Sequence, residues 1–170
     1  NGLGPAVPSC KLQELMEQLQ KLDSGDTLVL AGSIPSSLPS DIYQQIMEML
    51  KNKGIQIVVD ATKELLLKCL SFHPFLIKPN KHELEEIFDA TIHTKKEVVH
   101  YARLLQEHGA KNVMVSLSGD GAVFVSETGE IFEADVPPGT LINAVGAGDS
   151  MIAGFLAGWE TSADYKKAFH

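Results

Sequence analysis

The amino-acid sequence predicts an α/β fold: a three-layer α/β/α sandwich whose sheet is mostly parallel and includes a late antiparallel hairpin. Three observations predict it. Short apolar runs such as Thr27–Ala31 alternate with longer segments of amphipathic spacing. Each run stops at glycine, proline or polar residues, and after Gly121 the rhythm changes to two short strand-like segments. Parallel strands need a crossover connection that a helix usually supplies, so the alternation predicts a sheet covered on both faces.

The individual elements follow from residue spacing in chain order. Residues 9–22 carry apolar side chains at helical spacing behind Ser9, a candidate N-cap. The apolar segment 147–158 predicts a late helix, and residues 161–170 are typical of a helix that stops in mid-pattern. The other predicted elements are helices over 41–53, 63–70, 81–88 and 94–108, strands at 27–31, 55–59, 75–78 and 112–116, and a hairpin of 121–126 and 130–136 around a turn at 127–129.

Composition and charge narrow the class of partner. The formal net charge of -8 argues against nucleic-acid binding, because that affinity comes largely from clustered Lys and Arg. No apolar run approaches the roughly 20 residues of a membrane helix. The first residues lack the basic start and apolar core of a secretory signal, which predicts a cytoplasmic protein. We therefore expect small-molecule partners and neither nucleic acid nor membrane.

Cysteine and histidine offer no chemistry of their own. Cys10 and Cys69 form no CxxC pair, and both are expected to be reduced and packed in the interior. The six histidines lack metal-ligand spacing such as HExxH.

The most informative stretch is the glycine-rich loop Val145–Ser150. Two glycines around an alanine let backbone N–H groups turn inward, and a following helix adds unpaired N–H groups and a positive dipole end, which suits a phosphate. Asp149 could then accept a proton from a substrate hydroxyl. The alternative is a glycine turn with an aspartate helix cap. Met151 breaks a dinucleotide fingerprint, and no Walker A lysine follows.

Other candidate residues come directly after predicted strands, at the edge where open α/β sheets bind ligands. These are the Gly32–Pro39 loop, Asp60, the Lys78–Asn80 segment and the loop Ser116–Gly121. Asp60 is suggestive of a magnesium or lid contact.

These motifs together resemble a known family. Asn143–Leu156 closely resembles the second signature of the PfkB (ribokinase-like) carbohydrate kinases, which is built on Gly-Ala-Gly-Asp, although Ala144 departs from the usual Ser, Thr or Pro. Four further stretches resemble family motifs in the family's order, so that the resemblance covers essentially the whole chain. They are Asn1-Gly-Leu-Gly-Pro5, Ala31-Gly-Ser-Ile-Pro35, Lys78-Pro-Asn-Lys-His-Glu-Leu84 and Ser116-Leu-Ser-Gly-Asp-Gly121.

The resemblance implies a kinase that uses ATP and Mg²⁺, and it implies roles for single residues. Asp149 is the implied general base, and the backbone amides of Gly146, Ala147 and Gly148 stabilise the transferring phosphoryl group. Lys78 is expected at an ATP phosphate or, alternatively, exposed in solvent. Asn80 and Glu83 are expected in a magnesium shell, or as an ordinary polar first helical turn. Ser33 contacts the sugar phosphate or is a plain loop serine. The implied nucleotide loop comprises Ser116, Leu117, Ser118, Gly119, Asp120 and Gly121, which also suit a tight turn.

Within the family, the chain resembles the subgroup of 1-phosphofructokinases and tagatose-6-phosphate kinases. This implies fructose 1-phosphate as acceptor, giving fructose 1,6-bisphosphate, with tagatose 6-phosphate as the alternative. Residues 1–170 would be the nucleotide-binding and catalytic portion of a ribokinase-like domain, without counterpart to the family's N-terminal sugar-binding and lid part or its extreme C-terminus. The intact protein is expected to be a homodimer. Taken alone, the chain could instead be a nucleotide-binding fragment without turnover.

Overall fold

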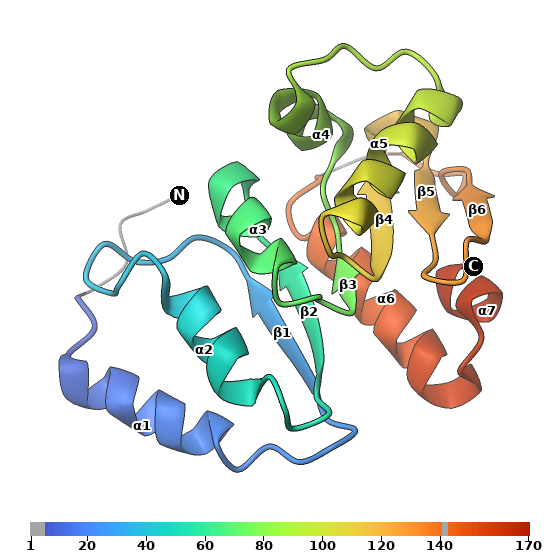
Figure 1. Ribbon diagram of the computed structural model, residues 1–170. Helices are drawn as coiled ribbons and strands as arrows, with labels where there is room; N and C mark the ends of the chain where they lie inside the picture. Colours follow the sequence, from blue (N-terminus) through green and yellow to red (C-terminus); the bar gives the residue numbers. More distant parts are fainter. Residues whose placement is uncertain (1–5, 141–142) are drawn as a thin grey trace.

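A computed structural model describes residues 6–140 and 143–170, so the Asn1–Pro5 motif lies outside the described residues. Six strands form one sheet in the order β1-β2-β3-β4-β5-β6 (Figure 1). β1 to β4 are parallel, and β5 runs antiparallel to β4 and β6. The strands are β1 (Thr27–Ala31), β2 (Gln56–Asp60), β3 (Leu76–Ile77), β4 (Asn112–Ser116), β5 (Ala122–Val125) and β6 (Ile131–Ala134).

Helices cover both faces of the sheet, which confirms the predicted three-layer fold class (Figure 1). α1 to α5 contribute to the core on one face, with Leu84 of α4 in that cluster, and α6 lies on the other face with α7 beside it. The helices are α1 (Ser9–Leu19), α2 (Ile42–Leu50), α3 (Lys63–Leu70), α4 (Lys81–Phe88), α5 (Lys95–Glu107), α6 (Ala147–Ser162) and α7 (Tyr165–Phe169), with a 3-10 turn η1 (Ser118–Asp120).

Alternation along the strands divides the core between these two faces. Successive side chains of a strand point to opposite faces, so Val113 and Val115 join the cluster under α1–α5, whereas Met114 joins the smaller cluster under α6. Phe155 of α6 packs in that smaller cluster with its ring centroid 5.0 Å from that of Phe124. Near-continuous apolar strands are what a doubly covered sheet requires.

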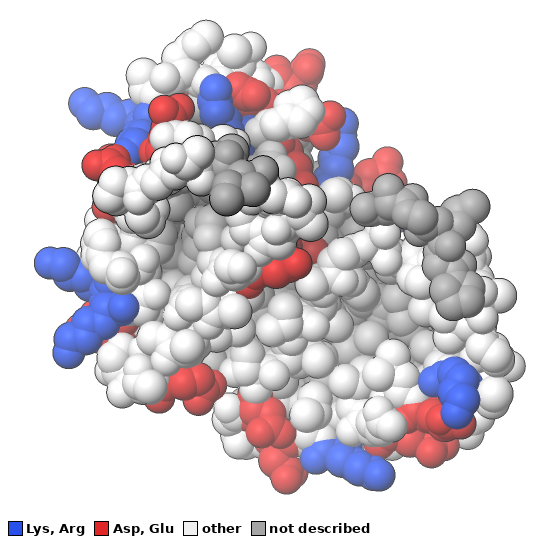
Figure 2. Space-filling view, turned by 180° about the vertical axis from the view of Figure 1, so that it is seen from behind, with Lys and Arg blue, Asp and Glu red and all other residues white. Residues whose placement is uncertain are grey.

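The β1 side of the sheet is less fully covered. β1 is an edge strand, and Val29 at its centre is 41% exposed. Figure 2 shows the molecule from behind, where charged side chains gather around the rim and the centre carries mostly uncharged residues.

Within residues 6–140 and 143–170, no helix has the length and apolar character needed to cross a membrane.

Several local predictions were wrong. Residues 161–170 are not one helix, because α6 ends at Ser162, Ala163 is left-handed with φ 48°, and α7 begins at Tyr165. Ser9 is not the N-cap of α1: Pro8 occupies that position, with no side-chain cap. α6 continues past Gly158 to Ser162, and a Cβ on Gly158 would lie 2.7 Å from the Cα of Ala168, so this glycine permits close packing of α7. Cys69 is buried as expected, but Cys10 is exposed; both are free thiols.

Candidate functional site

The register of the parallel strands brings the predicted strand-end residues to one edge of the sheet. Ala31 pairs with Asp60, and Val59 pairs with Ile77, so Gly32, Asp60 and Lys78 leave neighbouring strands at a similar level. An isolated parallel bridge between Asn80 and Ser116 adds the end of β4. Four loops that are far apart in sequence therefore meet where such sheets bind ligands.

Lys78 is buried beside Asp60. Its Nζ lies 3.3 Å from Oδ1 of Asp60, and the two side chains are 8% and 19% exposed. The alternative of a solvent-exposed lysine is therefore wrong. An ammonium withdrawn from water needs an anionic partner, and Asp60 supplies one from the end of β2.

The glycine loop leads into α6 without a side-chain cap. Gly146 is the N-cap residue with φ 79°, a left-handed conformation that favours glycine, and no side chain accepts a hydrogen bond there. Asp149 lies in the first helical turn and is exposed. The hydroxyl of Ser150 donates back to the carbonyl of Gly146 at 2.9 Å. The Ala147 N–H donates to the carbonyl of Ala144 at 3.1 Å, and among the described residues no side chain caps the other N–H groups of the first turn, which fits an anionic group.

Gly148 places this loop against Lys78. A Cβ on Gly148 would lie 2.9 Å from Nζ and 3.3 Å from Cε of Lys78, so a larger residue would displace the lysine. The buried positive charge and the positive end of the α6 dipole therefore lie on the same side of the loop. This arrangement favours binding of a negatively charged phosphoryl group.

Asn80 and Glu83 form a capping box at the start of α4. The Glu83 N–H donates to Oδ1 of Asn80 and the Asn80 N–H donates to Oε2 of Glu83, both at 2.8 Å. The alternative interpretation of this pair, an ordinary polar first helical turn, therefore also agrees with the structure. Among the described residues no hydrogen bond reaches Oε1 of Glu83, and no cluster of three or more His, Cys, Asp or Glu could hold a metal. A Mg²⁺ here would need phosphate oxygens and water for most of its ligands.

The predicted nucleotide loop forms the tight turn into the hairpin. The Leu117 N–H donates to the carbonyl of Gly121 at 2.8 Å, closing the turn. Gly121 has φ 85°, and a Cβ there would lie 1.9 Å from the carbonyl oxygen of Ala134, so only glycine fits. Ser118 has φ 52°, and Ser118, Gly119 and Asp120 are exposed. The loop can be a tight turn and also bind a ligand, because Ser118, Gly119 and Asp120 remain exposed after the turn has closed.

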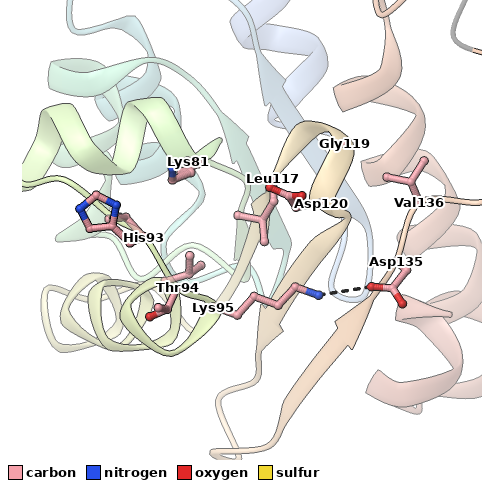
Figure 3. A pocket seen from close by; sticks show the side chains of 11 residues that line it. Lys81, His93, Thr94, Lys95, Leu117, Gly119, Asp120, Asp135 and Val136 are labelled. Atoms are coloured by element: carbon pink, nitrogen blue, oxygen red, sulfur yellow. Dashed lines mark hydrogen bonds and ion pairs between the residues drawn. The ribbon is translucent and has the colours of Figure 1, made fainter.

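A hollow of about 540 Å³ opens beside η1 (Figure 3). Of the predicted site residues, Leu117, Gly119 and Asp120 line it; Lys78 and Asp149 do not. Lys95 and Asp135 also line it, with Nζ of Lys95 3.4 Å from Oδ1 of Asp135. The rest of the lining is Lys81, Ile92, His93, Thr94, Val98 and Val136.

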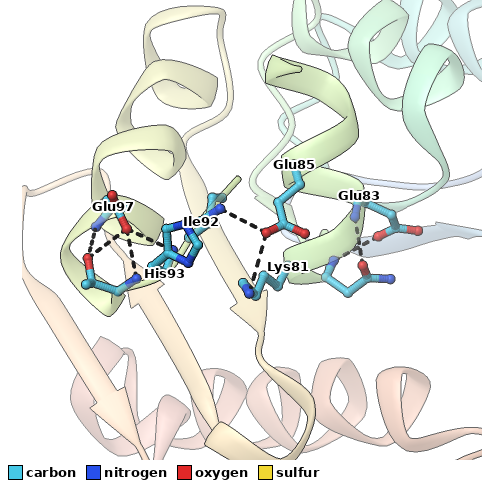
Figure 4. A network of polar contacts seen from close by, with 8 residues as sticks. Lys81, Glu83, Glu85, Ile92, His93 and Glu97 are labelled. Atoms are coloured by element: carbon cyan, nitrogen blue, oxygen red, sulfur yellow. Dashed lines mark hydrogen bonds and ion pairs between the residues drawn. The ribbon is translucent and has the colours of Figure 1, made fainter. Parts of the chain in front are cut away.

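Two glutamates fix the α4–α5 connection that borders this hollow (Figure 4). Oε1 of Glu85 accepts from the Ile92 N–H at 2.9 Å, and this bond, more than nearby Lys81, lowers the pKa of Glu85. Oε2 of Glu97 accepts from the N–H groups of His93 and Thr94 at 2.8 Å each, and these bonds lower the pKa of Glu97. The connection is therefore held by backbone contacts rather than left loose.

The Ser33 loop is anchored by a residue that sequence reasoning missed. Ser33 is exposed and follows Gly32, whose N–H donates to the carbonyl of Asp60 at 2.9 Å. The hydroxyl of Tyr43 donates to the carbonyl of Ala31 at 2.8 Å, and burial, followed by nearby Cys69 and Asp60, raises the pKa of Tyr43. The sequence offers no signal for this contact, because Tyr43 has the spacing of an ordinary core position in α2.

Comparisons with known proteins agree with this geometry. Residues 4–170 match the pfkB family carbohydrate kinase description. The chain is 47% identical over 170 residues to 1-phosphofructokinase of Bacillus subtilis, covering 99% of this chain and 55% of that protein. It is 31% identical over 166 residues to D-tagatose-1-phosphate kinase of Bacillus licheniformis, covering 97% and 54% respectively.

A solved structure is also similar to this chain. The crystal structure of phosphofructokinase-2 from Escherichia coli in complex with fructose-6-phosphate matches with a TM-score of 0.89 and 27% identity, covering 99% of this chain and 55% of that one. The chain thus spans about half the length of the curated relatives it matches.

Proposed function

Because the chain belongs to the pfkB family of carbohydrate kinases, we propose that the protein containing it transfers the γ-phosphoryl group of ATP to a phosphorylated ketohexose. The observation that carries the proposal is the uncapped start of α6, with Lys78 buried behind Gly148 and Asp149 exposed in the first turn. Phosphoryl transfer depends mainly on positioning and electrostatic stabilisation, and these groups offer both.

Each group has a distinct task in this proposal. Asp149 accepts the proton of the acceptor hydroxyl as that oxygen attacks phosphorus. The amides of Gly146, Ala147 and Gly148 donate to the phosphoryl oxygens, which requires the Ala147 amide to exchange its bond to the carbonyl of Ala144 for one to the phosphoryl group. ATP supplies the phosphoryl group, and Mg²⁺, held through Asn80 and Glu83 with intervening water, neutralises charge on its phosphates. The loop Ser116–Gly121 cradles the nucleotide through the amides of Ser118 and Gly119, because the other amides of the loop donate to backbone carbonyls.

Fructose 1-phosphate is the proposed acceptor, with Ser33 at its phosphate. The two curated relatives are named for fructose 1-phosphate and tagatose 1-phosphate chemistry, and both sugars leave the C6 hydroxyl free. Fructose 1,6-bisphosphate would be the product. A tagatose phosphate is the second candidate, favoured by the relative from Bacillus licheniformis; tagatose 6-phosphate presents the C1 hydroxyl instead.

The remaining part of the proposal concerns the protein as a whole. Since the chain spans about half of its relatives, we infer that the full-length protein carries out turnover, whereas residues 1–170 alone bind nucleotide without it. We also infer a cytoplasmic homodimer, from the sequence resemblance.

The test is an acceptor screen with the full-length protein and its Asp149→Asn variant. Product analysis with fructose 1-phosphate, fructose 6-phosphate, tagatose 1-phosphate and tagatose 6-phosphate identifies the acceptor. We expect Asp149→Asn to lower kcat about 1,000-fold, because general-base catalysis is removed. Glu160→Gln, an exposed carboxylate on the same helix, is the matched control and should leave kcat unchanged. An Asp149→Asn variant with full activity would overturn the assignment.

A further inference from the structure

Asp60 connects three parts of the site, although its role is not explained by the proposed function. Its carboxylate pairs with Lys78 at 3.3 Å, and its carbonyl accepts from the Gly32 N–H at 2.9 Å. It therefore joins the loop that carries Ser33 to the lysine behind the glycine loop. We propose that Asp60 is a positioning residue for phosphoryl transfer, holding the Lys78 ammonium against Gly148. This inference rests on the proposed kinase function.

The first step is that Lys78 depends on Asp60. The lysine side chain is 8% exposed, and Asp60 is its ion-pair partner within the described ranges. Removing one member of a buried pair leaves an uncompensated charge, which is strongly unfavourable. Without the carboxylate, the flexible lysine chain is expected to turn its ammonium toward water.

The second step is that Lys78 acts from behind the loop. A Cβ on Gly148 would lie 2.9 Å from Nζ, so the ammonium packs directly under the helix start. Gly148 lies within α6, and its φ lies outside the left-handed range, unlike that of Gly146. Its lack of a side chain is therefore explained by the lysine and not by backbone conformation.

The third step concerns the reaction. A positive charge fixed beneath the loop adds to the α6 dipole where the phosphoryl group crosses from donor to acceptor. Gly32 is held by the backbone carbonyl of Asp60, so replacing the carboxylate leaves that contact in place and changes the reaction through Lys78. We expect kcat to depend on Asp60 more strongly than the KM for ATP does, because the geometry between reactants is what changes.

The primary test is a double-mutant cycle in the full-length protein. Asp60→Asn is expected to lower kcat about 100-fold, the scale of a small misplacement of reacting groups. Asp60→Asn combined with Lys78→Met should lower kcat little beyond Lys78→Met alone, because the aspartate acts through the lysine. The affinity for a non-hydrolysable ATP analogue, measured by calorimetry, should show the same lack of additivity.

A surface ion pair provides the matched control. Lys63 and Glu86 lie 3.8 Å apart with side chains 51% and 40% exposed. Lys63→Met and Glu86→Gln remove an ion pair of the same chemistry outside the site, and both should leave kcat and analogue affinity unchanged.

A second cycle keeps the inference testable if Asp60→Asn does not fold. Gly148→Ala should lower kcat, and its effect should be several-fold smaller in a Lys78→Ala background, where the new methyl group has room. If the fold-losses in kcat of the two single variants multiply in the double variant, in either cycle, the inference is overturned. Normal kcat in Lys78→Met while Asp149→Asn is inactive would also overturn it, a result that leaves the proposed function standing. Full activity in Asp149→Asn would instead remove the proposed function itself.

Discussion

Helix starts at the same sheet edge are built in two opposite ways. α4 begins with a capping box in which Asn80 and Glu83 satisfy each other's backbone N–H groups, and α5 begins with the same device, made by Thr94 and Glu97. α6 begins with Gly146 in a left-handed conformation and has no side-chain cap. α4 and α5 use their own side chains to complete their first turns. At the start of α6 the Ala147 N–H donates to the carbonyl of Ala144 at 3.1 Å, but among the described residues no side chain caps the helix. In the proposed function, this difference distinguishes two stabilising helix starts from one that binds a ligand.

The largest expected effect comes from Gly146. Gly146→Ala should strain the left-handed N-cap and shift the loop amides, lowering kcat of the full-length protein about 100-fold, comparable to loss of an oxyanion-hole donor. Gly129→Ala is the matched control, because Gly129 also has positive φ with open space around it, 86° against 79°. Both variants should lose similar thermal stability, as measured by calorimetry. Equal kcat in the two variants would remove the distinction drawn for α6.

A smaller effect should separate the two capping boxes. Asn80→Ala and Thr94→Ala each remove one cap and should each cost about 1 kcal/mol in the free energy of unfolding. Only Asn80→Ala should also lower kcat, by about 10-fold, if its side chain helps to hold Mg²⁺ through ordered water. Urea unfolding and steady-state kinetics at varied Mg²⁺ check both expectations. An equal kcat in the two variants would mean that Asn80 acts only as a helix cap.

The smallest effect is a pH dependence at the start of α5. The His93 N–H, together with the Thr94 hydroxyl and N–H, lowers the pKa of Glu97 in the folded state. Its contribution to stability is therefore present above its unfolded pKa of about 4.3 and is lost as pH falls through the lower folded value. Glu97→Gln should shift the urea midpoint at pH 7 but not at strongly acidic pH. Exposed Glu107→Gln at the other end of the same helix should lower it at neither pH, because a carboxylate at a helix C-terminus does not stabilise the helix.

Much of this architecture was predictable from the sequence because it depends on local patterns. The apolar runs at 27–31 and 112–116 became β1 and β4 with the same bounds, since doubly covered strands have little choice of composition. The capping box of Thr94 and Glu97 likewise depends only on residues within one stretch of four. The position of Asp149 in the first turn of α6 followed from the glycine loop before it.

Features that depend on register or on distant segments were not predictable. Lys78 is buried because Asp60 and Gly148 arrive from other parts of the chain, so solvent exposure was an equal expectation. Cys10 was expected to be buried because free cysteines usually are, but it occupies an exposed position of α1. Ser9 failed as an N-cap because Pro8 already has the extended conformation that precedes the helix. The roles of the predicted site residues stay predictions.

The exposed side of β1 has a consequence for handling the chain in isolation. Among the described residues β1 has ladder partners on one side only, so its other side presents a row of N–H and C=O groups, and Val29 adds an exposed apolar side chain on a face of the same strand. Such an edge can template pairing with a second chain, so residues 1–170 produced alone should self-associate as concentration rises. A lysine at position 29 would place a charge on that surface, which would oppose pairing and favour a dispersed sample.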